Sequence, residues 1–330
     1  MKIFLTHNPE DREMYFDWAL EPLRGLGELV LNPGDRDLTP AELIEAAAGC
    51  EIVVAHRATP MAAAVLDRMP DLIALLRPAV DIRTIDVEAA SQNGVLVANG
   101  PPSFVASTAE MVLALMLDLA RNVSVSVLDY HAGHEPQTRL GTQLRDGTAG
   151  IIGYGAIGEY LAQILVAMGV RVLAHDPYKT VSAPGVEQTD LDSLLRGADF
   201  VLPLAVATGE TENLIDARAL SLMKPGALLV NCSRGNLVDE VAVAQALQTG
   251  RLGGLAMDVG RATDQRPSPH LAELPGVVAT PHLGGLTAQA ARPQALSPVE
   301  QIQAIVQRRM PPRAINADHA SRLKDYWCKH

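Results

Sequence analysis

One short run constrains the fold of this sequence more than any other feature: GYGAIG at positions 153–158. An apolar stretch typical of a buried strand precedes it at 149–152, and a helical stretch follows at 159–168. In such a strand–turn–helix the first glycine permits the tight turn, the second lets the backbone approach a pyrophosphate, and the third lets helix and strand pack closely. The helix then offers unpaired N–H groups and the positive end of its dipole to phosphates. The run therefore predicts a dinucleotide cradle, with cofactor contacts from Gly153, Tyr154, Gly155, Ala156, Ile157 and Gly158.

An acid in the next expected strand indicates which dinucleotide is bound. Asp176 ends the stretch 171–176 and stands eighteen residues after Gly158. A carboxylate at about this spacing accepts hydrogen bonds from the hydroxyls of an adenosine ribose, and it would repel a 2′-phosphate. The sequence therefore predicts NAD rather than NADP.

Short apolar runs alternate with helical stretches along the chain, which predicts parallel sheets in an α/β fold. Thr39 is expected to cap one helix, and Ser103 to cap a second helix that ends near Arg121. The last helix is expected at 297–309. A polar, weakly patterned stretch occupies 131–147. Strands are expected at 2–6, 28–32, 51–55, 72–76 and 94–98, and again at 149–153, 171–176, 200–204, 227–232, 254–259 and 277–279.

The chain is predicted to form two doubly wound domains, with a Rossmann dinucleotide-binding domain inserted in a flavodoxin-like substrate domain. The break near Asn99-Gly100-Pro101-Pro102 marks the crossing between them. We predict the substrate domain at 1–99 and 284–330, and the dinucleotide-binding domain at 100–283. A length of 330 residues, 48% of them hydrophobic, suffices for two cores.

Composition excludes several other classes. The net charge of −11 argues against general affinity for nucleic acid or an anionic membrane. Cys50, Cys232 and Cys328 lack the spacing of a zinc site or a disulfide framework. No bound metal is therefore expected, and the three cysteines are expected to be reduced thiols. The longest apolar helix candidate, 111–120, is too short to span a bilayer. A soluble, cytoplasmic protein is expected.

Later motifs carry a resemblance to a known family. They read LVNCSRGNLVDE at 229–240, GGLAMDV at 253–259 and ATPHLGG at 279–285, with ETENLI at 210–215 and MKPG at 223–226 before them. In this order, after the glycine-rich run, they resemble the D-isomer-specific 2-hydroxyacid dehydrogenases from about residue 72 to 316. The resemblance implies an NAD-dependent oxidoreductase acting on a 2-hydroxy or 2-oxo acid in the cleft between its domains. It also implies a homodimer formed through the helix at 103–121 and its neighbours.

The resemblance assigns roles residue by residue. Arg234 would hold the substrate carboxylate, because its guanidinium is a planar fork of donors. His282 matches the general acid–base, a task that suits a side chain whose pKa lies near neutral pH. Further cofactor contacts are implied for Thr208, Cys232, Asp258 and Gly284.

Two departures from the family pattern bear on the chemistry. The family's glutamate partner of the catalytic histidine falls by spacing on Thr263, so Asp264 or Gln265 would have to replace it. Without a carboxylate partner, His282 should hold its proton less tightly. In the substrate loop a glycine has become Asp81, beside Val80 and near Arg77. Asp81 would repel a substrate anion unless Arg77 or Arg83 offsets its charge. The alternatives are that Asp81 binds a hydroxyl or amine of a larger substrate, or that it turns away to pair with Arg83.

These departures leave two other functions open. One is an NAD-using enzyme of another class, such as a lyase or hydrolase that oxidises its substrate transiently. The other is a non-catalytic NAD-sensing module. The presence of both Arg234 and His282 counts against the module.

Overall fold

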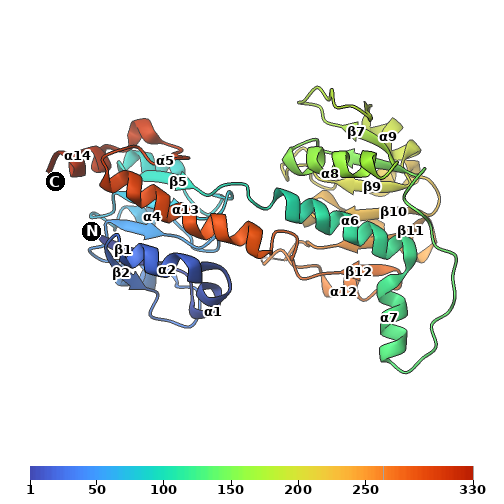
Figure 1. Cartoon of the computed structure of the whole chain (residues 1–330), viewed down its shortest axis with the longest axis horizontal. Helices are drawn as coiled ribbons and strands as arrows, with labels where there is room; N and C mark the ends of the chain where they lie inside the picture. The colour runs from blue at the N-terminus through green and yellow to red at the C-terminus, as the bar shows by residue number, and fades with distance from the viewer. Residues whose placement is uncertain (263, 330) are drawn as a thin grey trace. The chain divides into compact units, whose positions relative to one another are not determined.

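The computed structural model describes residues 1–262 and 264–329, and the chain divides into two compact units. Unit 1 comprises Met1–Ser103 and Ala288–His330, and unit 2 comprises Phe104–Thr287. The sequence had placed the two crossings at 99/100 and 283/284. Each unit contains one parallel sheet with helices around it, which confirms the α/β fold class with two doubly wound units (Figure 1).

Unit 1 has five parallel strands in the order β2-β1-β3-β4-β5, the flavodoxin-like arrangement. Alternate residues of each strand enter two cores: Ile3 and Leu5 join one, and Phe4 joins the other. Burial on both faces explains why these strands read as continuous apolar runs. The strands are β1 (Lys2–Leu5), β2 (Glu28–Leu31), β3 (Ile52–Val54), β4 (Ala74–Arg77) and β5 (Leu96–Asn99).

The helices of unit 1 include two from the end of the chain, α13 and α14, which return to this sheet (Figure 1). A π-helical turn at Arg12–Phe16 joins α1 to α2. The helices are α1 (Pro9–Asp11), α2 (Asp17–Arg24), α3 (Pro40–Ala46), α4 (Ala63–Leu66), α5 (Val87–Gln92), α13 (Ala288–Val306) and α14 (Ser321–Lys329).

Unit 2 has seven parallel strands in the order β12-β11-β10-β9-β6-β7-β8. The strands are β6 (Thr148–Ile152), β7 (Arg171–His175), β8 (Val186–Gln188), β9 (Phe200–Pro203), β10 (Ala227–Asn231), β11 (Leu252–Met257) and β12 (Val277–Ala279). The helices are α6 (Val105–Arg121), α7 (Val123–His131), α8 (Ala156–Ala167), α9 (Leu191–Gly197), α10 (Ala217–Leu222), α11 (Glu240–Gln248) and α12 (Pro269–Ala272).

Every predicted strand is present, with its ends within two residues of the predicted ones. Thr39 caps α3 as predicted, and Glu42 completes a capping box with it. The cap assigned to Ser103 is wrong. Phe104 occupies that position without a side-chain hydrogen bond, and the Ser103 hydroxyl instead donates to the Ala290 carbonyl at 2.7 Å.

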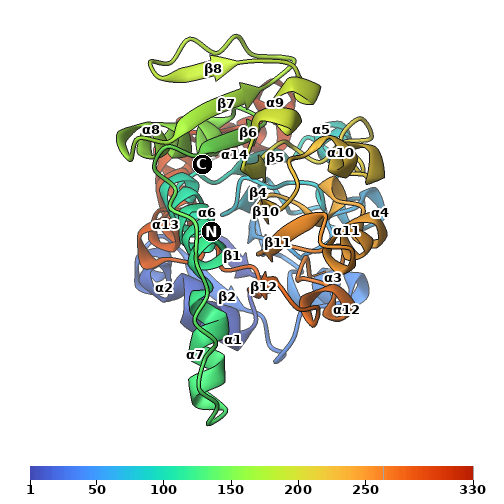
Figure 2. The same ribbon diagram turned by 90° about the vertical axis from the view of Figure 1, so that its right-hand side faces the viewer.

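Several elements were not predicted as they occur. Strand β8 and helices α7 and α14 were missed, and α13 begins at Ala288 rather than at residue 297. Helix α7 projects away from the sheet of unit 2 (Figures 1 and 2), and none of its nine residues is buried. Among the described residues, no single helix is long and apolar enough to cross a membrane; only α6 and α7 taken together, bent by 68°, pass such a test.

Candidate active site

The glycine-rich turn lies between β6 and α8, at the carboxyl end of the first strand of unit 2. Gly153 has a φ of +94°, and a Cβ there would lie 2.5 Å from the Ala205 backbone nitrogen. A Cβ on Gly158 would lie 2.6 Å from the Gly153 carbonyl oxygen. At Gly155, in contrast, a Cβ would have none of the described atoms within 4 Å. The first and third glycines are therefore required by the protein's own packing, whereas the second leaves open space.

This open space meets the amino end of α8, a helix of twelve residues. Gly155 is its N-cap and provides no side chain to the first N–H groups of the helix. Unpaired N–H groups at a helix terminus bind phosphate, and the missing side chain lets a phosphate approach them. The turn therefore fits the pyrophosphate of a dinucleotide.

Asp176 follows β7 and braces this turn. Its Oδ2 accepts a hydrogen bond from the Tyr154 backbone nitrogen at 2.9 Å, and its Oδ1 accepts from the backbone nitrogens of Tyr178 and Lys179 at 2.9 and 3.1 Å. The Tyr154 side chain is only 2% exposed, so this residue faces the turn through its backbone. Tyr178 donates a hydrogen bond to Glu210 that joins the loops after β7 and β9 and could not be predicted from the sequence.

Arg234 lies just beyond β10, where side chains fix the backbone. Asn231 Nδ2 donates to the Arg234 carbonyl at 2.9 Å, and Asn231 Oδ1 accepts from the Ser233 nitrogen at 3.1 Å. The Ser233 hydroxyl donates to the Ala205 carbonyl at 2.7 Å, which ties the segment to the loop after β9. Arg234 is half-buried, and its Nη1 donates to the Ser233 carbonyl at 2.7 Å. Its guanidinium is thus held at the carboxyl edge of the sheet.

Asp258 and His282 follow the next two strands, β11 and β12. Asp258 is 1% exposed, and its carboxylate accepts hydrogen bonds from the Thr280 hydroxyl at 2.6 Å and from the Leu283 and Gly284 nitrogens at 2.7 Å each. His282 lies between these donors with a φ of +64°. Thr280 and Leu283 were not singled out from the sequence, since only the fold brings them to Asp258.

The loop after Asp258 contains the candidates for the histidine's partner. A Cβ on Gly235 would lie 2.2 Å from the Gly260 carbonyl carbon, so this loop packs directly beside Arg234. The Asp264 side chain is 58% exposed and forms an ion pair with Arg266 at 3.5 Å. Gln265 has a φ of +61°, and its buried Oε1 has no hydrogen-bond partner among the described residues. Thr263 lies outside the described residues.

The remaining predicted cofactor residues also lie in unit 2. Thr208 is in the exposed loop after β9, where its nitrogen donates to the Thr211 hydroxyl at 2.8 Å. Cys232 is 6% exposed, and burial raises the pKa of its thiol. A Cβ on Gly284 would lie 2.9 Å from Asp258 Oδ2, so a larger residue there would displace that carboxylate.

The predicted substrate residues belong to unit 1, at the carboxyl end of β4. Arg77 is fully buried, which lowers the pKa of its guanidinium to about 10, and its Nη2 donates to the Thr84 hydroxyl at 2.7 Å. The Val80 carbonyl accepts from Asn99 Nδ2 at 3.1 Å. Arg83 donates to both carboxylate oxygens of Asp81, from Nε at 3.0 Å and from Nη2 at 2.6 Å. The pairing of Asp81 with Arg83, one of the two predicted alternatives, is therefore present.

Unit 1 also contains a polar cluster that the sequence did not predict. His56 follows β3, and its Nε2 lies 3.8 Å from Asp11 while its Nδ1 lies 3.5 Å from Asp37. The hydrogen bond with His56 lowers the pKa of Asp37. His7 lies just after β1, and the centroids of the His7 and His56 rings are 5.1 Å apart. Asp11, Asp37 and His56 each offer one ligand atom, and these atoms all lie within 4.8 Å of one another, so the cluster has the composition and spacing of a possible metal site.

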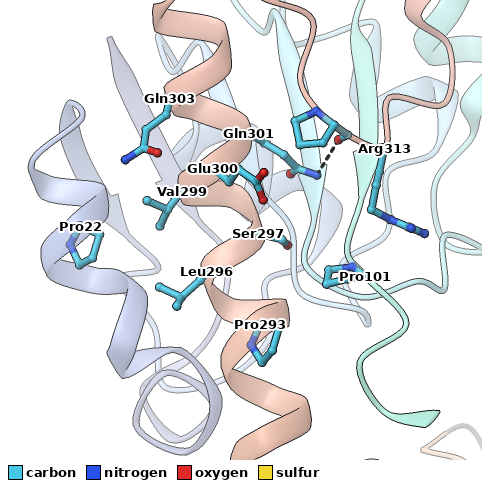
Figure 3. Close-up of a pocket in the computed structure, with 11 residues that line it drawn as sticks. Pro22, Pro101, Pro293, Leu296, Ser297, Val299, Glu300, Gln301, Gln303 and Arg313 are labelled. Atoms are coloured by element: carbon cyan, nitrogen blue, oxygen red, sulfur yellow. Dashed lines mark hydrogen bonds between the residues drawn. The ribbon is translucent and has the colours of Figure 1, made fainter.

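A separate groove of about 550 Å³ lies between α2 and α13 of unit 1 (Figure 3). Four prolines line it, and Gln301 is hydrogen-bonded beside it to the Pro312 carbonyl at 3.3 Å. None of the predicted site residues lines this groove.

Residues 113–284 match the family model described as "D-isomer specific 2-hydroxyacid dehydrogenase, NAD binding domain". This chain belongs to that family. The match confirms the resemblance seen in the motifs, and it identifies NAD as the cofactor of this 2-hydroxyacid dehydrogenase domain.

Individual relatives agree with this assignment. The D-3-phosphoglycerate dehydrogenase of Mycobacterium leprae (strain TN) is 36% identical over 281 residues, which cover 84% of this chain and 53% of that protein. The hydroxypyruvate reductase of Thermotoga maritima is 31% identical over 284 residues, covering 83% of this chain and 92% of that protein. A crystal structure from Polaromonas sp. JS6 66, described as "putative D-isomer specific 2-hydroxyacid dehydrogenase, NAD-binding", matches with a TM-score of 0.87 and 26% identity, and covers 95% of this chain and 99% of that one. The chain spans about half the length of the phosphoglycerate dehydrogenases that it matches.

Proposed function

We propose that this protein is an NAD-dependent oxidoreductase that interconverts a 2-hydroxy acid and its 2-oxo acid. One observation carries the proposal: the cradle, Arg234 and His282 all follow strands of the same parallel sheet, at its carboxyl edge. Ligands of open α/β sheets bind at that edge. Family membership supports the reaction class.

The residues divide the work by their chemistry. Bound NAD supplies or accepts the hydride. Arg234 holds the substrate carboxylate through charge-assisted hydrogen bonds, and His282 gives a proton to the carbonyl oxygen or takes one from the hydroxyl. The dinucleotide contacts proposed for the cradle, Asp176, Thr208, Cys232, Asp258 and Gly284 complete the cofactor site.

The partner of His282 is proposed from the loop after Asp258. The Asp264 carboxylate is already paired with Arg266. Gln265 has a buried amide oxygen without a described partner, and an amide oxygen can accept a hydrogen bond from an imidazole N–H. These observations favour Gln265 over Asp264. Because an amide carries no charge, His282 would hold its proton less tightly than beside a carboxylate.

Unit 1 is proposed as the substrate domain, with the loop at Arg77, Val80 and Asp81 nearest the substrate. The hydrogen bonds from Arg83 partly offset the charge of Asp81. A homodimer is proposed through α6 and its neighbours, of which α7 offers the exposed apolar residues Val127, Leu128 and Tyr130. A cytoplasmic location is proposed because all three cysteines are free thiols.

A turnover assay tests the proposal. The protein is mixed with NADH and a panel of 2-oxo acids, and the absorbance of the reduced nicotinamide is followed. Arg234→Ala and His282→Ala are each expected to lower kcat/KM at least about 100-fold, the usual contribution of a positioned acid–base group. Arg218→Ala and His270→Ala serve as matched controls, since both side chains are exposed elsewhere on unit 2. Tight NADH binding without turnover across the panel would instead favour an NAD-sensing module or another reaction class.

A further inference from the structure

His282 occupies a backbone conformation that needs support. Its φ of +64° lies in the left-handed region, which residues other than glycine rarely adopt. Its nitrogen donates to the carbonyl of Thr280, only two residues earlier, at 2.9 Å. Such a tight, sparsely populated turn persists only where the surrounding structure over-determines it. The imidazole of His282 therefore depends on whatever holds residues 280–284 in place.

The Asp258 carboxylate holds this turn from both sides. Oδ1 accepts from the Thr280 hydroxyl before His282 and from the Leu283 nitrogen after it, and Oδ2 accepts from the Gly284 nitrogen. All three distances lie between 2.6 and 2.7 Å, as expected for hydrogen bonds to a charged acceptor.

Asp258 is itself fixed at the end of β11. Its nitrogen donates to the Asn231 carbonyl of β10 at 3.0 Å, and the Thr280 nitrogen donates to the Met257 carbonyl at 3.0 Å. With 1% of its surface exposed, the carboxylate cannot exchange its partners for bulk water. The turn is thus tied to the ends of two central strands.

We propose that Asp258 is a positioning residue that fixes the His282 turn and thereby aims the imidazole used in proton transfer. The proposal rests on the acid–base role assigned above to His282. A carboxylate offers about four acceptor sites, of which this one uses three, and the fourth is on Oδ2. The nicotinamide contact expected of Asp258 from the family resemblance is therefore compatible with this role.

Thr280→Val separates the two roles, because it removes one hydrogen bond from the turn and leaves Asp258 in place. The expected result is an about tenfold lower kcat, equivalent to about 1.4 kcal/mol, with the Kd for NADH unchanged. Thr280→Ser keeps the hydroxyl and should restore the rate. Thr249→Val is the matched control, since the Thr249 hydroxyl bonds to the Gln245 carbonyl at the end of α11. An unchanged kcat in Thr280→Val, a matching loss of NADH affinity, or a failure of serine to restore the rate would overturn the proposal.

A second measurement is independent of turnover. Hydrogen exchange of the Leu283 and Gly284 amides should be slow in the wild type and much faster in Asp258→Asn, because the asparagine presents an N–H group to one of these donors. Asp199→Asn is the control, since Asp199 also accepts a backbone hydrogen bond, from Thr148 at 2.8 Å. If the wild type reduced no oxo acid, the proposed function would fail while amide protection still tested the support of the turn. If these amides exchanged at the same rate in both proteins, the positioning role would fail even in an active dehydrogenase.

Discussion

His7 shows how a single buried side chain ties stability to pH. Its ring is 4% exposed and lies 4.4 Å from that of Phe16. Burial lowers its pKa well below the ordinary value, and the positive charges of His56, Arg77 and Arg12 add to the effect. The folded protein therefore keeps His7 neutral at pH values where the unfolded chain would protonate it.

The sign of the pH effect follows from this difference. Below the ordinary histidine pKa of about 6.5 the unfolded state binds more protons, so the free energy of unfolding should fall as pH falls, by up to about 1.4 kcal/mol per pH unit from this group. His7→Gln, which cannot titrate, should flatten that decline. Urea unfolding one pH unit above and one below 6.5 measures the effect. His270→Gln is the control because His270 is exposed, and equal declines in wild type and His7→Gln would contradict the assignment.

At the residue scale, sequence identified positions better than partners. Gly153, Gly158 and Asp176 could be placed because a phosphate-binding turn requires those residue types at that spacing. The hydrogen bonds of Asp258 could not be predicted, since they join residues more than twenty positions apart whose meeting depends on the register of β11 and β12. The full burial of Arg77 could not be predicted from the sequence either, because arginine is rarely buried.

At the element scale, the βα turn allows a test that separates packing from cofactor binding. Gly155→Ala adds a Cβ to empty space, so the melting temperature should stay unchanged. The same methyl group would fill the space through which a pyrophosphate approaches α8, and the Kd for NADH should rise at least about tenfold, or 1.4 kcal/mol. Gly158→Ala should instead lower the melting temperature, because its Cβ would lie 2.6 Å from a carbonyl oxygen. If calorimetry showed the same NADH affinity in Gly155→Ala as in the wild type, the glycine-rich turn would not be part of the cofactor site.

The elements that sequence predicted and those it missed differ in physical character. Strands buried on both faces read as apolar runs whatever the topology, so their positions were predictable. Strand β8 is a three-residue edge strand with mostly polar residues. Helix α7 reads VSVSV at 123–127, a period-two pattern more typical of a strand. Helix α13 contains Pro293 and Pro298, and prolines normally indicate the start or a break of a helix. The first nine residues of α13 were therefore not predicted to be helical.

At the scale of the whole molecule, the chain leaves unit 1 after β5 and returns to it with α13. Sequence indicated this insertion because the break near Pro101 and the last helix flank a complete βα series. The substrate could not be predicted in the same way. The charge of a loop side chain such as Asp81 can be interpreted only together with the partner that the fold provides, here Arg83.

The oligomeric state is the remaining property of the whole molecule open to a direct test. Helix α7 exposes several large apolar side chains, among them Leu128 at 65% and Tyr130 at 69%, and exposed apolar patches mark interaction sites. If a second copy covers this face, light scattering after size exclusion should give twice the chain mass of 35.1 kDa, and Leu128→Glu should give the single mass, because a buried charge in an apolar interface is strongly unfavourable. Val241→Glu changes an equally exposed residue on α11 and should leave the dimer intact. A wild-type monomer, or a Leu128→Glu protein that remains dimeric, would show that α7 is not the interface.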